Sequence, residues 1–301
     1  MTNSSGEHWR AVLITGPTAS GKSAYAVARA EAAGGVVINA DSMQVYDTLH
    51  VLTARPSLAD MQGIPHRLYG HVPAGADYST GGWLRDIAAL LAQLDDEGRM
   101  PVIVGGTGLY FKALTEGLAA MPPVPADIRA RWRRALEEEG ALTLHTRLSK
   151  RDPEMAMRLR PSDGQRIVRA LEVFSASGRS IADFQSENPP PLIDAAAADK
   201  IVVLPERPVL HQRINHRFET MLEAGAVEEV EALLALGLDP AAPVMRAIGV
   251  KEIAAMLSGE MSRAEVIEKA SAATRQYAKR QMTWFRNQMG SEWKRLDPAI
   301  G

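Results

Sequence analysis

The sequence of 301 residues predicts an α/β protein, in which a parallel sheet flanked by helices carries a mostly helical insertion domain. Strand-like and helix-like segments alternate over residues 1–117, which is typical of a parallel sheet with helices on both faces. Strand character then disappears until residues 201–204. Glycine-rich turns follow two of the strand-like segments, at the edge where sheets of this kind bind ligands.

The first strand and the first helix enclose a glycine-rich loop. Residues 11–15 are an apolar run of strand type, and the alanine-rich residues 24–33 are typical of a helix. Residues 16–23 read GPTASGKS, a complete phosphate-binding loop of the pattern G-x-x-x-x-G-K-[ST]. Its glycines allow backbone N–H groups to surround phosphate oxygens, Lys22 supplies a positive charge, and the Ser23 hydroxyl can bind Mg²⁺. The loop therefore predicts polyphosphate or pyrophosphate binding on a sheet like that of P-loop NTPases, and it leaves open what carries the phosphates.

The other elements of the sheet follow in order. Residues 36–39 are a candidate second strand, and residues 81–97 place apolar side chains at helical spacing. Residues 101–104 are typical of a buried strand, a Gly-Gly-Thr-Gly turn follows, and another helix begins at residues 110–114.

Two proline-rich breaks delimit the helical insertion. The first follows Gly117 at residues 121–125, and the second is at residues 188–191. We predict that residues 118–197 form the insertion domain, and that residues 1–117 and 198–301 form the core domain. After residues 201–204 return to strand character, the sequence from Arg207 to the end predicts helices only, at 209–224, 227–236, about 247–257 and 263–288.

Composition excludes several classes of site. There is no cysteine, which excludes disulfides, thiolate zinc sites and cysteine nucleophiles. No apolar stretch reaches the length of a membrane span and the N-terminus has no secretory signal, so we expect a cytoplasmic protein. The net charge of −2 argues mildly against nucleic-acid binding. Three basic clusters nevertheless could bind a polyanion or form solvated helix faces. They comprise Arg129, Arg131, Arg133 and Arg134; Arg158, Arg160, Arg166 and Arg169; and Arg275, Lys279, Arg280 and Arg286.

Two polar residues follow strands of the predicted sheet. Asp41 begins the segment DSMQVY after the second strand, where its carboxylate would face the ligand crevice as a Mg²⁺ ligand or a general base. A helix N-cap is the structural alternative. Thr107 lies among the glycines that follow residues 101–104, and these fit either close backbone approach to a ligand or a plain strand-to-helix turn.

A later helix carries a candidate anion clamp. Arg213 and Arg217 are four residues apart and share one helix face, so two guanidinium groups could bind a pyrophosphate. The alternative is an exposed basic helix. We interpret His66 and His71 as structural residues.

Taken together, the motifs resemble those of one family. GPTASGKS, DSMQVY, VGGTGLY, QRIVRALEV and TRQYAKRQMTWFR occur in that order between Gly16 and Arg286, nearly the whole chain. They are similar to the motifs of the bacterial tRNA dimethylallyltransferases, also called tRNA isopentenyltransferases. The phosphate loop alone is generic, whereas the later motifs are specific.

This resemblance implies transfer of a dimethylallyl group from dimethylallyl diphosphate to N6 of the adenosine on the 3′ side of the anticodon in tRNA. The phosphate loop would hold the donor diphosphate rather than ATP, with Mg²⁺ at Ser23. Asp41 would be the general base, Thr107 would act near the bridging oxygen, and the insertion would contact the anticodon stem-loop. The implied catalytic residues are Asp41, Thr107 and Lys22. The donor-binding set is Gly16, Pro17, Thr18, Ala19, Ser20, Gly21, Lys22 and Ser23, to which the helix pattern adds Arg213 and Arg217. The implied tRNA-binding set is Asp41, Ser42, Met43, Gln44, Thr107, Arg129, Gln165, Arg166, Ile167, Val168 and Arg169.

Two rival functions share the phosphate loop. A small-metabolite kinase shares the sheet and an aspartate base, but it would need a pocket for a nucleotide base and usually a mobile basic lid. A non-catalytic RNA-binding ATPase switch is the other rival. The later motifs favour prenyl transfer over both, and we expect a monomer.

Overall fold

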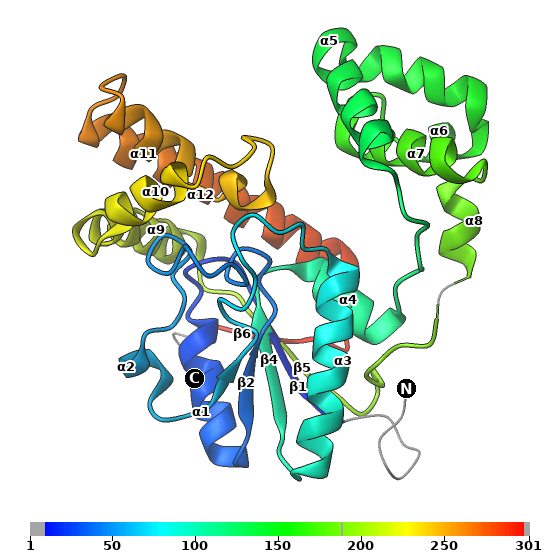
Figure 1. The fold of residues 1–301 in the computed structure, drawn as a ribbon. Coiled ribbons are helices and arrows are strands. Elements are labelled where there is room, and N and C mark those ends of the chain that lie inside the picture. The colour runs from blue at the N-terminus through cyan, green and yellow to red at the C-terminus, as the bar shows by residue number, and fades with distance from the viewer. Residues whose placement is uncertain (1–9, 188, 298–301) are drawn as a thin grey trace. The chain divides into compact units, whose positions relative to one another are not determined.

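The protein contains a six-stranded parallel sheet with helices on both faces (Figure 1). The computed structural model describes residues 10–187 and 189–297. In these residues the strand order is β3-β2-β4-β1-β5-β6, and every neighbouring pair is parallel. The strands are β1 (Val12–Thr15), β2 (Val36–Asn39), β3 (His66–Arg67), β4 (Pro101–Gly105), β5 (Asp199–Val203) and β6 (Lys294–Leu296). The predicted fold class is confirmed.

Alternate side chains of the central strands enter two different cores. Leu13 of β1 packs with residues of α3 (Thr80–Asp96) and α4 (Gly108–Glu116), whereas its neighbour Ile14 packs with residues of α1 (Lys22–Ala33). Because successive side chains of a strand point to opposite faces and both faces are covered, the strands are continuous apolar runs.

Four helices after β5 build a further core with the loop that follows β2. Tyr46 of that loop is buried with residues of the C-terminal helices. Glu229 accepts the backbone N–H groups of His50, Val51 and Leu52 at 2.6 to 3.0 Å, so both of its carboxylate oxygens are used. The loop is therefore anchored to the C-terminal helices. The elements of this region are α2 (Leu58–Met61), α9 (Arg207–Glu223), α10 (Ala226–Ala235), the 3₁₀ helix η1 (Pro243–Arg246), α11 (Val250–Leu257) and α12 (Arg263–Gln288).

Residues 116–191 form a second compact unit, which we call the helical unit. The described residues up to Thr115 and from Leu192 onward form the sheet unit. Gly140, with φ of 78° and ψ of 165°, interrupts the longest helix of the helical unit. The indole N–H of the buried Trp132 donates to the Ser175 hydroxyl at 3.0 Å. The helices are α5 (Ala126–Arg151), α6 (Pro153–Arg158), α7 (Gly164–Ser177) and α8 (Ile181–Ser186).

The sheet unit differs from the prediction at two places. The described residues after 191 belong to it, because Ile193 is fully buried in its core and donates its N–H to the Leu114 carbonyl at 3.0 Å. The prediction of helices only after Arg207 was wrong, because β6 pairs with β5. β6 is a three-residue edge strand with two exposed charged side chains, so it lacks the apolar run that marks a central strand.

The short elements α2, α8 and β3 were not predicted either. In the part of the chain that the structure describes, none of the helices combines the length and the apolar character needed to cross a bilayer.

Candidate active site

The phosphate loop joins the end of β1 to the start of α1. Gly21, directly before α1, has φ of 89°, in the left-handed region that favours glycine. A Cβ on Gly16 would lie 2.5 Å from the Val203 carbonyl oxygen, so the loop packs closely against the end of β5. Lys22 Nζ donates to the Pro17 carbonyl at 3.2 Å, which bends the side chain over the loop. Ser23 is exposed at the N-terminal end of α1, where free N–H groups favour an anion.

A cavity of about 690 Å³ is lined by this loop and by α9. Lys22 and Ser23 contribute to its wall from the loop, and Arg213 and Arg217 contribute from α9. Both arginines of the predicted clamp therefore lie at the phosphate loop. The positive charges around one cavity favour an anionic ligand such as a diphosphate. The rest of the wall is made by Ala19, Ser20, Gly21, Ala24, Tyr25, His216 and Leu296.

The cations of this cavity have lost much of their hydration. Burial lowers the pKa of Lys22 from 10.5 to about 8, although the Asp41 carboxylate raises it, and Arg217 lowers it further. Burial also lowers the pKa of Arg217, again against the effect of Asp41. A bound anion would compensate these desolvated charges. The two shifts also place Asp41 within electrostatic reach of both cations.

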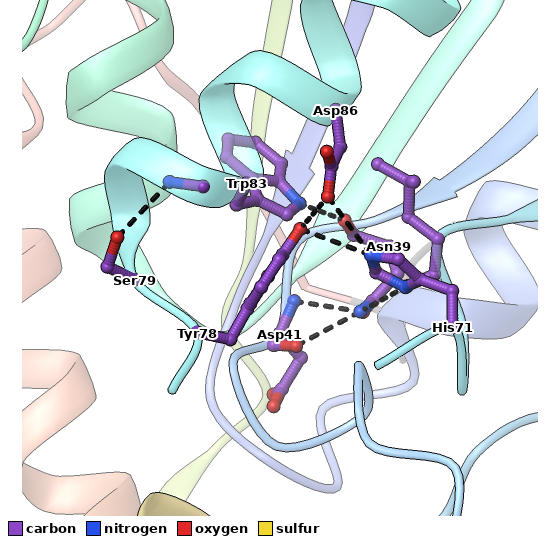
Figure 2. A network of polar contacts seen from close by, with 9 residues as sticks. Asn39, Asp41, His71, Tyr78, Ser79, Trp83 and Asp86 are labelled. Atoms are coloured by element: carbon purple, nitrogen blue, oxygen red, sulfur yellow. Dashed lines mark hydrogen bonds and ion pairs between the residues drawn. The ribbon is translucent and has the colours of Figure 1, made fainter. Parts of the chain in front are cut away.

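Asp41 lies on a turn after β2 that Asn39 holds in place (Figure 2). The Asn39 side chain accepts the N–H of Asp41 at 2.9 Å and donates to the carbonyls of Asp41 and Leu68 at 3.0 Å. The Trp83 indole N–H donates to the Asn39 carbonyl at 2.9 Å. Because Asn39 is fully buried, these satisfied polar groups fix the turn.

The Asp41 carboxylate closes a short turn of its own. Its Oδ1 accepts the N–H of Met43 at 2.9 Å. No helix of the described chain begins between Asp41 and Leu58, so the helix N-cap alternative is wrong. Burial, and then the charge of Asp41, raise the pKa values of three phenols near this turn. These phenols are Tyr69, Tyr110 and Tyr277, and they are neutral at neutral pH.

Thr107 lies on the turn after β4 and touches the turn that carries Asp41. Its hydroxyl accepts the N–H of Ser42 at 3.0 Å and lies 3.3 Å from the Ser42 hydroxyl. A Cβ on Gly105 would lie 2.0 Å from the Ala40 carbonyl oxygen, and one on Gly106 would lie 3.4 Å from Asp41 Oδ2. Close packing of the two turns therefore requires a glycine at residue 105.

Other residues of the DSMQ segment are engaged within the chain or only partly exposed. The Gln44 amide nitrogen donates to the carbonyls of Thr53 and Ala54 at 3.0 and 2.9 Å, which uses both of its hydrogens. An RNA contact by this side chain would have to use its oxygen. Ser42 and Met43 are partly exposed.

The implied tRNA residues of the helical unit differ in accessibility. Gln165 and Arg166 of α7 are exposed and Arg169 is partly exposed. Ile167 and Val168 are buried in the core of the helical unit, so their side chains are structural and cannot contact RNA. Any continuous segment of a packed helix directs some of its side chains toward the core, and in this segment of α7 these are the apolar side chains.

Carboxylates neutralise part of the second arginine cluster. Arg158 pairs with Glu154, Arg166 lies 3.6 Å from Asp163, and Arg169 lies 3.4 Å from Glu172. In the first cluster, Arg129 lies on α5 and is partly exposed, and the exposed Arg131 guanidinium lies over the Trp132 ring at 5.2 Å.

Sequence reasoning did not single out two buried amides, Asn39 and Gln281. Gln281 lies in the last motif and Asn39 ends the second predicted strand, yet only the fold reveals that their side chains bridge separate segments. His66 and His71, which we interpret as structural residues, make polar contacts with nearby residues. His66 Nδ1 lies 2.8 Å from the Ile64 carbonyl, and burial lowers its pKa. His71 contacts Tyr78 and Asp86, as Figure 2 shows.

The residues at the loop fit a hard cation that is shared with a diphosphate. The exposed Ser23 hydroxyl could supply one oxygen ligand, since Mg²⁺ is usually held by few protein ligands together with phosphate oxygens and waters. Within the described residues, no three His, Cys, Asp or Glu side chains gather as a metal site. Mg²⁺ at Ser23 would therefore need the bound diphosphate.

Comparison with known proteins assigns the family. A family model described as IPP transferase matches residues 44–288, and one described as isopentenyl transferase matches residues 9–71. The tRNA dimethylallyltransferases of Agrobacterium fabrum and Rhizobium meliloti are each 67% identical to this chain. The matches cover 97% of this chain in both cases, and 98% and 97% of those proteins.

Solved structures agree with this family. The tRNA isopentenylpyrophosphate transferase of Bacillus halodurans has a TM-score of 0.68 at 32% identity, and the match covers 96% of this chain and 89% of that one. A eukaryotic dimethylallyltransferase acting on tRNA has a TM-score of 0.79 at 27% identity, with 96% and 73% covered. The phosphate loop, the order of the motifs and these similarities together mean that the chain belongs to the tRNA dimethylallyltransferase family of prenyl-transferring enzymes.

Proposed function

We propose that this enzyme transfers the dimethylallyl group of dimethylallyl diphosphate to N6 of the adenosine that follows the anticodon in tRNA, releasing diphosphate. The observation that carries the proposal is the position of Asp41 within electrostatic reach of Lys22 and Arg217, which line the cavity at the phosphate loop. A cationic cavity beside a carboxylate suits a reaction in which an anion departs and an amine loses a proton.

The donor diphosphate would lie in the cavity, against the N–H groups of the phosphate loop and Lys22. When the allylic C–O bond breaks, both bonding electrons remain on the diphosphate, and the cations already in place stabilise that charge. Arg217 or Arg213 would contact the diphosphate from α9. Ser23 would hold Mg²⁺, which adds positive charge at the leaving group when it is bound.

On the acceptor side, Asp41 would take the proton that the N6 amine loses as the new C–N bond forms. Since Oδ1 accepts the N–H of Met43, we assign the proton to Oδ2. The Thr107 hydroxyl, already in contact with Ser42, would hydrogen-bond at the reacting centre. General-base assistance of this kind contributes about 10² to 10⁴ in rate.

The target base must leave its stack to reach Asp41. This costs a few kcal/mol and is easiest in a loop, where RNA-binding proteins commonly read splayed bases. We infer that the exposed Gln165 and Arg166 contact the anticodon stem-loop together with Arg129. Because tRNA is a cytoplasmic molecule, we expect the enzyme to act in the cytoplasm, and we expect it to act as a monomer.

Incubation with labelled dimethylallyl diphosphate, Mg²⁺ and unmodified tRNA, followed by nucleoside analysis, tests the proposal. Label should appear in a modified adenosine. Lys22→Met should abolish the signal, whereas Gln288→Glu, an exposed change on α12, should not. No transfer by the wild-type enzyme, or label in another nucleoside, would contradict the proposal.

A small-metabolite kinase is the alternative that the phosphate loop alone would allow, and family membership disfavours it. The two functions predict different ligands. Prenyl transfer predicts thermal stabilisation by a non-hydrolysable dimethylallyl diphosphate analogue with Mg²⁺, whereas a kinase predicts stabilisation by ATP and phosphoryl transfer from it.

A further inference from the structure

Helix α12 buries one glutamine whose partners lie at the candidate active site. The Gln281 residue is 6% exposed, whereas Gln276 and Gln288 of the same helix are exposed. A buried amide is unfavourable unless its donor and its acceptor are both satisfied. The groups that satisfy Gln281 therefore indicate what it holds.

The two partners of Gln281 belong to two different loops. Its Oε1 accepts the backbone N–H of Thr18 in the phosphate loop at 3.0 Å. Its Nε2 donates to the carbonyl of Gly106, in the turn after β4, at 2.9 Å. These partners lie 263 and 175 residues away along the chain. One side chain thus connects the loop that would bind the donor to the turn that carries Thr107.

The space around Gly106 is filled from two sides. A Cβ at this position would lie 2.4 Å from Gln281 Nε2 and 3.4 Å from Asp41 Oδ2. The amide of Gln281 and the carboxylate of Asp41 therefore flank the same backbone position. A displacement of Gln281 would move Gly106 and, through it, the Thr107 hydroxyl.

Neighbouring turns of α12 contact the same two loops. Ala278, one turn before Gln281, packs in a small apolar cluster with Ala19 of the phosphate loop. Trp284, one turn after, lies against Gly108, where a Cβ would be 2.3 Å from its ring. Three successive turns of α12 therefore contact the phosphate loop or the turn after β4, and the middle one contacts both.

We propose that Gln281 is a positioning residue for prenyl transfer, because its amide sets the separation between the phosphate loop and the Gly106–Thr107 turn beside Asp41. The inference rests on the proposed function. The leaving oxygen, the allylic carbon and the amine nitrogen must align for displacement, and a misplacement of about 1 Å can lower a rate by roughly 10²-fold. Gln281 acts through the two loops and touches neither substrate.

Gln281→Glu should keep one of the two hydrogen bonds of Gln281 and remove the other. A carboxylate still accepts the Thr18 N–H, but it cannot donate to the Gly106 carbonyl and repels it. At pH 8 we expect kcat to fall about 10- to 100-fold, while the KM for the prenyl donor changes by less than about threefold. Gln288→Glu, the same change at an exposed position of α12, is the matched control and should keep the wild-type kcat.

The pH profile distinguishes positioning from a general loss of structure. Lowering the pH toward 6 protonates a buried glutamate, and the neutral acid can again donate to Gly106. The ratio of the Gln281→Glu rate to the wild-type rate should therefore rise as the pH falls. Gln281→Leu has a similar volume but leaves both partners unsatisfied, so it should lose activity without any recovery at low pH.

Either of two results would overturn the role of Gln281. One is a wild-type kcat for Gln281→Glu at every pH. The other is a loss of rate in both variants that matches the loss of folded protein, measured by circular dichroism at the assay temperature. Wild-type enzyme is assayed in parallel. Failure of the wild type to prenylate tRNA would refute the proposed function, whereas an active wild type beside an unaffected variant refutes only the positioning role.

Discussion

Replacing Lys22 by methionine should make the ligand-free protein more stable while it removes affinity for diphosphate. The pKa of Lys22 falls from 10.5 to about 8 in the folded state. At roughly 1.4 kcal/mol per pKa unit, keeping this ammonium charged at pH 7 destabilises the fold by about 3 kcal/mol. Lys22 is partly exposed, and the hydrogen bond to Pro17 would be lost. With solvent screening and that loss included, we expect a net gain of about 1 to 2 kcal/mol in the free energy of unfolding.

The pH dependence of this gain identifies its cause. Between about pH 8 and 10.5 the folded wild type releases the Lys22 proton that the unfolded chain still holds. Stability of the wild type therefore rises with pH in that window relative to the variant, which has no titrating group at residue 22. The difference between Lys22→Met and wild type should be widest below pH 8 and should close toward the upper end of the window.

Urea unfolding at several pH values measures this difference, and thermal unfolding with inorganic pyrophosphate measures binding. Pyrophosphate should raise the Tm of the wild type and leave that of Lys22→Met unchanged. Lys251→Met, a change at an exposed lysine of α11, is the control and should show no pH-dependent gap. A Lys22→Met protein that is less stable than wild type at pH 7, or a gap that stays constant above pH 8, would refute the reasoning that the cavity holds a desolvated cation.

Other variants test the acceptor side and the RNA surface. Asp41→Asn keeps the size of the side chain but removes its basicity, so single-turnover prenyl transfer should fall about 10²-fold or more while the donor Kd is unchanged. Thr107→Val removes the acceptor of the Ser42 N–H, and we expect a loss of about 1 kcal/mol in urea unfolding together with a lower kcat. Replacing Arg131 and Arg133 by glutamine should weaken tRNA binding and flatten its salt dependence, by about 0.7 to 0.9 in log–log slope for each phosphate that is no longer bound. The first expectation is contradicted if Asp41→Asn changes the donor Kd. The second is contradicted if Thr107→Val is as stable as wild type, and the third if the double arginine variant keeps the wild-type salt slope.

Long buried elements of the sheet unit could be predicted from the sequence because their side-chain pattern is strong. β2 occupies the predicted residues 36–39 and α12 the predicted residues 263–288. In the first case every side chain is buried, and in the second a serine N-cap and helical spacing mark the element. β6 escaped prediction because pairing with β5 stabilises a short charged segment that has no strand pattern of its own.

The candidate site was predictable to the extent that strand ends meet at one edge of a parallel sheet. Asp41 and Thr107 follow β2 and β4, which are hydrogen-bonded neighbours, and their turns are in contact. The buried state of Ile167 and Val168 follows from packing within the helical unit, which a motif does not reveal. The bridge made by Gln281 joins residues far apart in the chain, so no local pattern of α12 distinguishes it from an exposed glutamine.

The position of β6 has a consequence for the synthesis of the protein. Leu296 of this strand lines the cavity at the phosphate loop, and Gln281, which precedes this strand on α12, accepts the N–H of Thr18 in that loop. A chain emerging from the ribosome presents the phosphate loop first, and Gln281, whose amide contacts this loop, follows only 263 residues after Thr18. The cavity is therefore completed long after the phosphate loop has been synthesised, so a nascent or truncated chain with the phosphate loop alone would lack the complete cavity and would not compete effectively for the prenyl donor.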